Sequence, residues 1–129
     1  MRALNTYDKI VYLCHGYGGS VENLNDITSK LKRFTKLHPN YLFISPVNMY
    51  NELYDIVDYN EGLDMCLYLL TTIATEMWVC DINYNESTGC KAEIEVCKER
   101  GIPVKYFVSD RYYAKEPFVE EESVGDLYD

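Results

Sequence analysis

The chain has 129 residues, of which 47% are hydrophobic and 26% charged, a balance that predicts one folded domain with its own core. Twelve Lys and Arg residues stand against 21 Asp and Glu residues, which gives a formal net charge of -9. This acidic balance argues against nucleic acid and anionic membrane surfaces as partners, because both bind basic patches.

The five cysteines show no CxxC spacing, and each lies within or beside an apolar run. We interpret them as small buried hydrophobes in a reducing cytoplasm, and we expect neither a metal nor another cofactor. The N-terminus lacks a signal-peptide pattern, and no apolar run approaches the roughly 20 residues that span a bilayer. The 13 tyrosines suit either a ligand cleft or half-buried positions at the edge of the core.

The first third of the chain predicts a strand, a glycine loop and a helix. KIVYLC at 9–14 is apolar and partly β-branched, and HGYGGS at 15–20 ends it. Ser20 is the predicted N-cap of a helix whose apolar residues recur every three or four positions: Val21, Leu24, Ile27, Leu31 and Phe34. We interpret its late cations, which include Lys30, as residues favoured by the helix dipole.

The middle of the chain predicts a second strand and a strongly apolar helix. The strand covers 41–45 and ends at Pro46, and 47–60 reads as a loop or short helical turn beside a cleft. The next segment, 61–73, is apolar almost all round and predicts a helix packed deeply against the sheet. Its polar exceptions, Asp64 and Tyr68, are one turn apart on one face.

The last elements complete an α/β pattern. A third strand at 76–80, a helix at 87–100 capped by Gly101 and a fourth strand at 104–108 follow in order. Alternation of this kind predicts a three-layer α/β sandwich, flavodoxin/Rossmann-like, with a parallel sheet of four to five strands in the order 2-1-3-4(-5). We expect a domain over 1–108 and an acidic, Tyr-rich tail over 109–129 that packs on the surface or is partly mobile.

Two loops at the carboxyl ends of the strands could bind a ligand. The glycines of HGYGGS, Gly16, Gly18 and Gly19, could bring backbone N–H groups to an anion or could simply form a turn with positive φ. His15 could act as an acid or base, contact a ligand, serve as a cap or simply be exposed. Asp81 ends the third strand at the same edge, where α/β sheets bind ligands.

The segment Ser87-x-Gly89-x-x-x-Glu93 carries the strongest chemical signal. Ser87 and Gly89 sit where a helix begins and could receive a phosphate or carboxylate. A capping box would need Glu or Gln at the third helical position, which is Cys90, so helix capping does not explain Glu93. A glutamate at this edge could attack an anomeric carbon. An acid such as Asp64 on an apolar helix could orient a sugar hydroxyl or share a proton, or could reach solvent.

These segments resemble the nucleoside 2-deoxyribosyltransferase superfamily, which includes the 2′-deoxynucleoside 5′-phosphate N-hydrolases. The resemblance covers roughly 9–107 and is most specific in STGCKAEIEVCKERGIPV, with VYLCHGYGGSVEN and MCLYLL...MWVCD similar to earlier family segments. It implies that Glu93 is the nucleophile at C1′, that Ser87 receives the 5′-phosphate as in the hydrolases, and that Tyr12 and the loop glycines border the sugar.

The family's catalytic Asp falls on Tyr68, one turn after Asp64. Either Asp64 substitutes for it, or the domain binds a nucleotide without efficient turnover. The resemblance therefore implies cleavage or transfer at an N-glycosidic bond, with a non-catalytic nucleotide or nucleotide-sugar module as the alternative and an NAD-glycohydrolase-like or cyclic-nucleotide-handling domain as a third hypothesis. A small-molecule nucleoside or nucleotide is the expected ligand. The resemblance also implies a homo-oligomer, because members of this superfamily commonly complete their sites across subunits.

Overall fold

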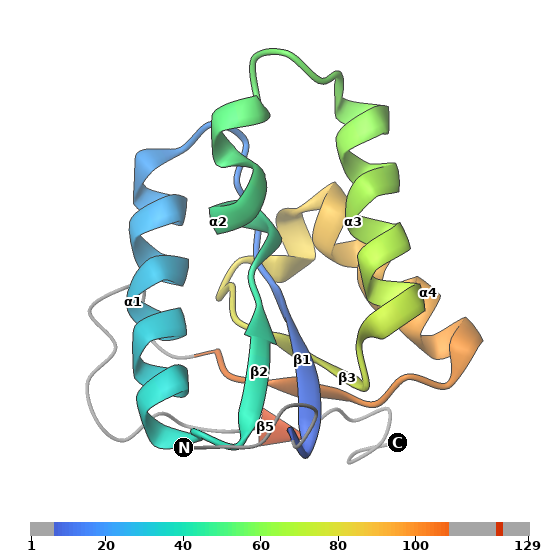
Figure 1. Cartoon of the computed structure of the whole chain (residues 1–129). Helices are drawn as coiled ribbons and strands as arrows, with labels where there is room; N and C mark the ends of the chain where they lie inside the picture. The colour runs from blue at the N-terminus through green and yellow to red at the C-terminus, as the bar shows by residue number, and fades with distance from the viewer. Residues whose placement is uncertain (1–6, 109–120, 123–129) are drawn as a thin grey trace.

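The computed structural model describes residues 7–108 and 121–122. Strands and helices alternate along the chain, as the sequence predicts (Figure 1). The elements in chain order are β1 (Lys9–Cys14), α1 (Val21–Leu37), β2 (Tyr41–Ile44), α2 (Pro46–Tyr50), the 3-10 helix η1 (Asn51–Leu53), α3 (Tyr59–Ile73), β3 (Glu76–Val79), the 3-10 helix η2 (Tyr84–Glu86), α4 (Thr88–Arg100), β4 (Val104–Tyr106) and β5 (Glu121–Glu122).

Four strands form a parallel sheet in the order β2-β1-β3-β4, which confirms the predicted topology. In its centre, Tyr12 of β1 is in register with Ile44 of β2 on one side and Met77 of β3 on the other. The fifth strand, β5, pairs antiparallel with β4 at the edge. Part of the predicted tail therefore joins the sheet, and the rest of that prediction lies outside the described residues.

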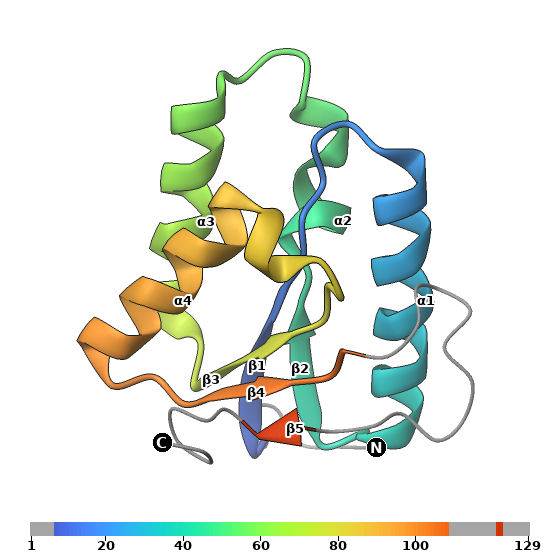
Figure 2. The same cartoon turned by 180° about the vertical axis from the view of Figure 1, so that it is seen from behind.

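Helices cover both faces of the sheet, with α1 on one side and α3 and α4 on the other (Figures 1 and 2). The core divides accordingly. Val11 and Leu13 of β1 belong to the cluster on the α1 face, whereas Tyr12 and Cys14 belong to the cluster on the α3 and α4 face. Because neighbouring strand residues are buried on opposite faces, the strands read as continuous apolar runs.

The helix caps follow the sequence signals. The hydroxyl of Ser20 accepts from the backbone N–H of Asn23 at the start of α1, and that of Ser87 accepts from Cys90 at the start of α4. Gly101 ends α4 in the left-handed conformation, with φ of 72°. All five cysteines are free thiols, and only Cys66 is not buried.

Helix α3 corrects one expectation. It begins at Tyr59, two residues earlier than predicted, because Asp58 forms a capping box with Glu61. It also packs less deeply than its apolar composition suggests, since Leu70 is its one buried residue. Within the described part of the chain, no helix is long and apolar enough to cross a membrane.

Candidate functional site

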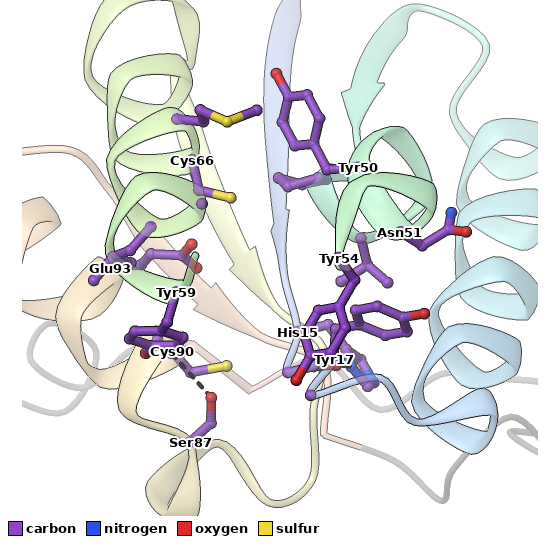
Figure 3. Close-up of a pocket in the computed structure, with 18 of the residues that line it drawn as sticks. His15, Tyr17, Tyr50, Asn51, Tyr54, Tyr59, Cys66, Ser87, Cys90 and Glu93 are labelled. Carbon is purple, nitrogen blue, oxygen red and sulfur yellow. Dashed lines mark hydrogen bonds between the residues drawn. The ribbon is translucent and has the colours of Figure 1, made fainter. Parts of the chain in front are cut away.

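A cavity of about 630 Å³ opens beside the carboxyl ends of β1 and β2. It lies between the loop after β1 and the α2–η1 segment on one side and the first turns of α3 and α4 on the other (Figure 3). This is the edge at which open parallel sheets bind ligands, and the volume is in the range of small-molecule sites.

Tyrosines line much of this cavity. Tyr17, Tyr50 and Tyr54 come from the side of the β1 loop and α2–η1, and Tyr59 faces them from α3 (Figure 3). The rings of Tyr17 and Tyr54 meet edge to face with centroids 5.2 Å apart. Such rings offer flat apolar surfaces on which an aromatic base can stack, and hydroxyl groups for hydrogen bonds.

Glu93 forms the chemical centre of the cavity. Its side chain lies on the α3–α4 side and is buried, with the residue 7% exposed. The Tyr12 hydroxyl donates to Oε2 of Glu93 at 2.6 Å. Burial raises the pKa of Glu93 to about 7, although hydrogen bonds from Tyr12 and Cys14 oppose the shift. A carboxyl group that titrates near neutrality in a cleft is typical of a functional site.

The position of Glu93 follows from the phase of α4. Cys90, Glu93 and Cys97 are its buried residues, and their i, i+3, i+7 spacing forms one inward stripe. Its middle position carries an acid where a hydrophobic residue would pack better, which costs stability. Helix capping explains the serine at position 87. Neither capping nor packing of α4 explains why position 93 carries an acid.

The glycine loop is held by a carboxylate. Oδ2 of Asp81 accepts from the backbone N–H of Gly16 at 3.0 Å, and its Oδ1 accepts from that of Asn83 at 2.8 Å. A Cβ atom on Gly16 would lie 3.0 Å from Asp81 Oδ2, so a larger residue here would crowd the Asp81 carboxylate. Gly18 and Gly19 have φ of 58° and 77°. Asp81 therefore positions the loop, and the turn geometry accounts for these two glycines.

A buried ionic network supports the same loop. His15 places Nε2 2.7 Å from Asp26 Oδ2, and its Nδ1 donates to the Gly16 carbonyl at 2.7 Å. Lys30 donates to Asp26 Oδ2 at 3.0 Å and to the Cys80 carbonyl at 2.6 Å. The sequence pattern indicates a late cation favoured by the helix dipole at Lys30, whereas its side chain is fully buried and is paired with Asp26.

A family model described as a domain of unknown function (DUF7768) matches residues 9–107. The chain belongs to this family. Neither the curated proteins nor the solved structures gave a match. The family description states no activity, so the resemblance to the deoxyribosyltransferases stays a prediction.

The structure brings seven of the predicted site residues to the cavity. They are Tyr12, His15, Gly16, Gly18, Ser87, Gly89 and Glu93. Gly19 and Asp81 are outside its lining. Among the described residues, no group of three His, Cys, Asp or Glu side chains is arranged to hold a metal ion.

Asp64 and Tyr68 are not brought to the site. Both are exposed, Tyr68 at 69%, and neither lines the cavity. The prediction that they share one face of α3 is confirmed, but the helical phase turns that face away from the cavity, to which Leu63 and Cys66 contribute. The assignment of Asp64 and Tyr68 as catalytic residues therefore has no support in the geometry.

Several lining residues were not singled out from the sequence: Tyr17, Tyr50, Tyr54, Asp58, Tyr59, Cys66 and Cys90. The signal was the excess of tyrosines, together with the aperiodic segment 47–60. That segment does flank the cavity, as predicted, through α2, η1 and the residues before α3.

Proposed function

We propose that the protein cleaves or transfers at the N-glycosidic bond of a 2′-deoxynucleoside or its 5′-monophosphate. The observation that carries the proposal is the buried carboxyl group of Glu93 in a tyrosine-lined cavity. The residue resemblance supports the same assignment, because it implies a nucleophilic glutamate at this position.

In the proposed reaction, a carboxylate oxygen of Glu93 attacks C1′ of the sugar. The C1′–N bond breaks as the new C–O bond forms, and the base leaves with the bonding electrons and takes up a proton. Water, or a second base in a transfer reaction, then attacks C1′ and releases Glu93. Tyr12 donates a hydrogen bond to Oε2, which holds the carboxyl group in place.

The direct test is release of free base. The protein is incubated with each of the four 2′-deoxynucleosides and each 5′-monophosphate, and products are separated by chromatography. We expect base release from at least one compound and none with Glu93→Ala. Equal release by wild type and Glu93→Ala would refute the role of Glu93, and no release from any compound would refute turnover.

The proposed nucleophile also predicts a pH dependence. Because the pKa of Glu93 is raised to about 7, the attacking carboxylate is a minor form at pH 6 and the major form at pH 8. Base release should increase as the pH rises through this range. Tyr12→Phe removes a hydrogen bond that lowers the pKa of Glu93. The increase in the rate of base release should therefore occur at higher pH in Tyr12→Phe than in the wild type. If the rate rises over the same pH range in Tyr12→Phe as in the wild type, the hydrogen bond does not control the pKa of Glu93.

One observation favours a second candidate function, a nucleotide or nucleotide-sugar binding module without turnover. Asp64 and Tyr68 lie outside the cavity, so neither residue predicted to handle the leaving base is near Glu93. Saturable calorimetric binding of a nucleoside or nucleotide without release of base would support this candidate. Failure to bind any member of a broad nucleotide panel would exclude it.

A further inference from the structure

A second cavity adjoins the first at the position where the 5′ end of the substrate is expected. Its volume is about 550 Å³, and Gly16, Tyr17, Gly18 and Ser87 line both cavities. The first turns of α1 and the η2 segment complete it. A 5′ substituent directed toward Ser87 from a sugar beside Glu93 would therefore enter this second cavity.

The charge of the second cavity is negative. Three carboxylates line it, those of Glu22, Asp81 and Glu86. Its other polar side chains are neutral, from Ser20, Asn23, Asn83 and Ser87. Within the described part of the chain, neither cavity has a Lys or Arg among its lining residues. The surroundings thus favour a neutral or cationic group over a phosphate.

Two features oppose this negative field. The N-terminal ends of α1 and α4 lie at the second cavity, and a helix terminus acts as roughly half a positive charge. His15 Nδ1 lies 3.6 Å from Asp81 Oδ2, and the backbone N–H groups of Gly16 and Asn83 also satisfy this carboxylate. The carboxylates of Glu22 and Glu86 are exposed and still act directly on a group in the cavity.

We infer that the site takes the unphosphorylated 2′-deoxynucleoside and discriminates against its 5′-monophosphate, with Glu22 and Glu86 as the discriminating residues. This inference rests on the proposed function. It replaces the expectation, drawn from the resemblance, that Ser87 receives a phosphate. The hydroxyl of Ser87 accepts from the Cys90 N–H and has one O–H left to donate, so it offers a phosphate a single neutral hydrogen bond and no charge, whereas a 5′-hydroxyl can also donate to nearby carboxylate or amide oxygens.

The test compares binding within matched pairs. Dissociation constants are measured by calorimetry for the four 2′-deoxynucleosides and their 5′-monophosphates, with Glu93→Gln used to prevent turnover. For the base that binds best, we expect the monophosphate to bind about tenfold more weakly or worse, since a phosphate dianion near two exposed carboxylates loses on the order of 1–2 kcal/mol. A 5′-amino-5′-deoxynucleoside should bind at least as well as the nucleoside.

Charge-neutral variants assign the effect to residues. Adding Glu22→Gln and Glu86→Gln should improve monophosphate binding relative to nucleoside binding by about threefold to tenfold. Glu95→Gln is the matched control, because Glu95 is exposed on α4 and lines neither cavity. The same gain in Glu95→Gln would show a general effect of net charge and overturn the assignment to Glu22 and Glu86.

The outcomes separate this inference from the proposed function. Tighter binding of the monophosphate than of its nucleoside overturns the inference and leaves the proposed function standing. Absence of binding by every nucleoside and monophosphate overturns both. Nucleoside binding with weak monophosphate binding, combined with base release from the nucleoside by wild-type protein, supports both.

Discussion

Glu93→Gln is expected to make the protein more stable at pH 8 by about 3 kcal/mol, and to lower turnover by at least about 10³-fold. Burial raises the pKa of Glu93 from its ordinary value of 4.5 to about 7, so the fold must accommodate an ionised carboxylate in a dry site above that pH. Gln keeps the shape and can still accept from Tyr12, but it carries no charge.

The direction of the pH dependence follows from proton binding. The folded protein holds the Glu93 proton more tightly than the unfolded chain, because its folded-state pKa is the higher one. Wild-type stability therefore falls as the pH rises from about 4.5 to about 7 relative to a variant that cannot titrate there. The advantage of Glu93→Gln should be less than about 1 kcal/mol at pH 5 and should grow by about 2.5 kcal/mol by pH 8.

Urea unfolding at a series of pH values measures this difference. Groups away from Glu93 titrate equally in both proteins and cancel when the two curves are subtracted, and its neighbours Tyr12, Cys14 and Cys66 have pKa values above this pH range. Glu95→Gln serves as the control, because Glu95 is exposed on the same helix and should give a flat difference. A flat difference for Glu93→Gln as well would mean that Glu93 is not destabilised in its ionised form.

Much of the fold could be predicted because the strands carry a local signal. Burial on both faces requires apolar side chains at successive positions, as at Val11 and Tyr12, so strands and sheet order followed from the pattern of runs and connections. The apolar composition of α3 gave a wrong prediction, namely that this helix packs deeply against the sheet. Its apolar residues are shared between the sheet and an open cavity, and composition does not distinguish burial in a core from exposure to a ligand site.

Seven of the predicted site residues line the cavity, because the ends of strands and the starts of helices leave local signals in the sequence. Glu93 stood out because Cys90 occupies the position at which a capping box would place an acid. Asp26 and Lys30 lie four residues apart on α1, a spacing that allows an ion pair, but their burial depends on His15 and on the carbonyl of Cys80, which lie 11 and 50 residues away in sequence. Contacts of this range arise from the sheet order and leave no local pattern.

Lys30→Met is expected to destabilise the fold by about 3 kcal/mol, because it removes one partner of a buried ion pair and leaves the other in place. Asp26 would lose its ammonium partner at 3.0 Å, and the Cys80 carbonyl would lose its donor at 2.6 Å. Lys32→Met is the matched control, since Lys32 is exposed on the same helix and should change stability by less than about 0.5 kcal/mol.

A double-mutant cycle distinguishes a charge effect from a packing effect. Asp26→Asn alone leaves the ammonium of Lys30 buried without its carboxylate, whereas the double variant Asp26→Asn/Lys30→Met buries neither charge. We therefore expect the double variant to be at least about 1 kcal/mol more stable than the sum of the single losses, measured by urea unfolding at pH 7. Additive losses would show that the two side chains stabilise the fold independently. Because His15 connects this network to the Gly16 carbonyl, a coupled result would also explain how α1 holds the glycine loop beside Glu93.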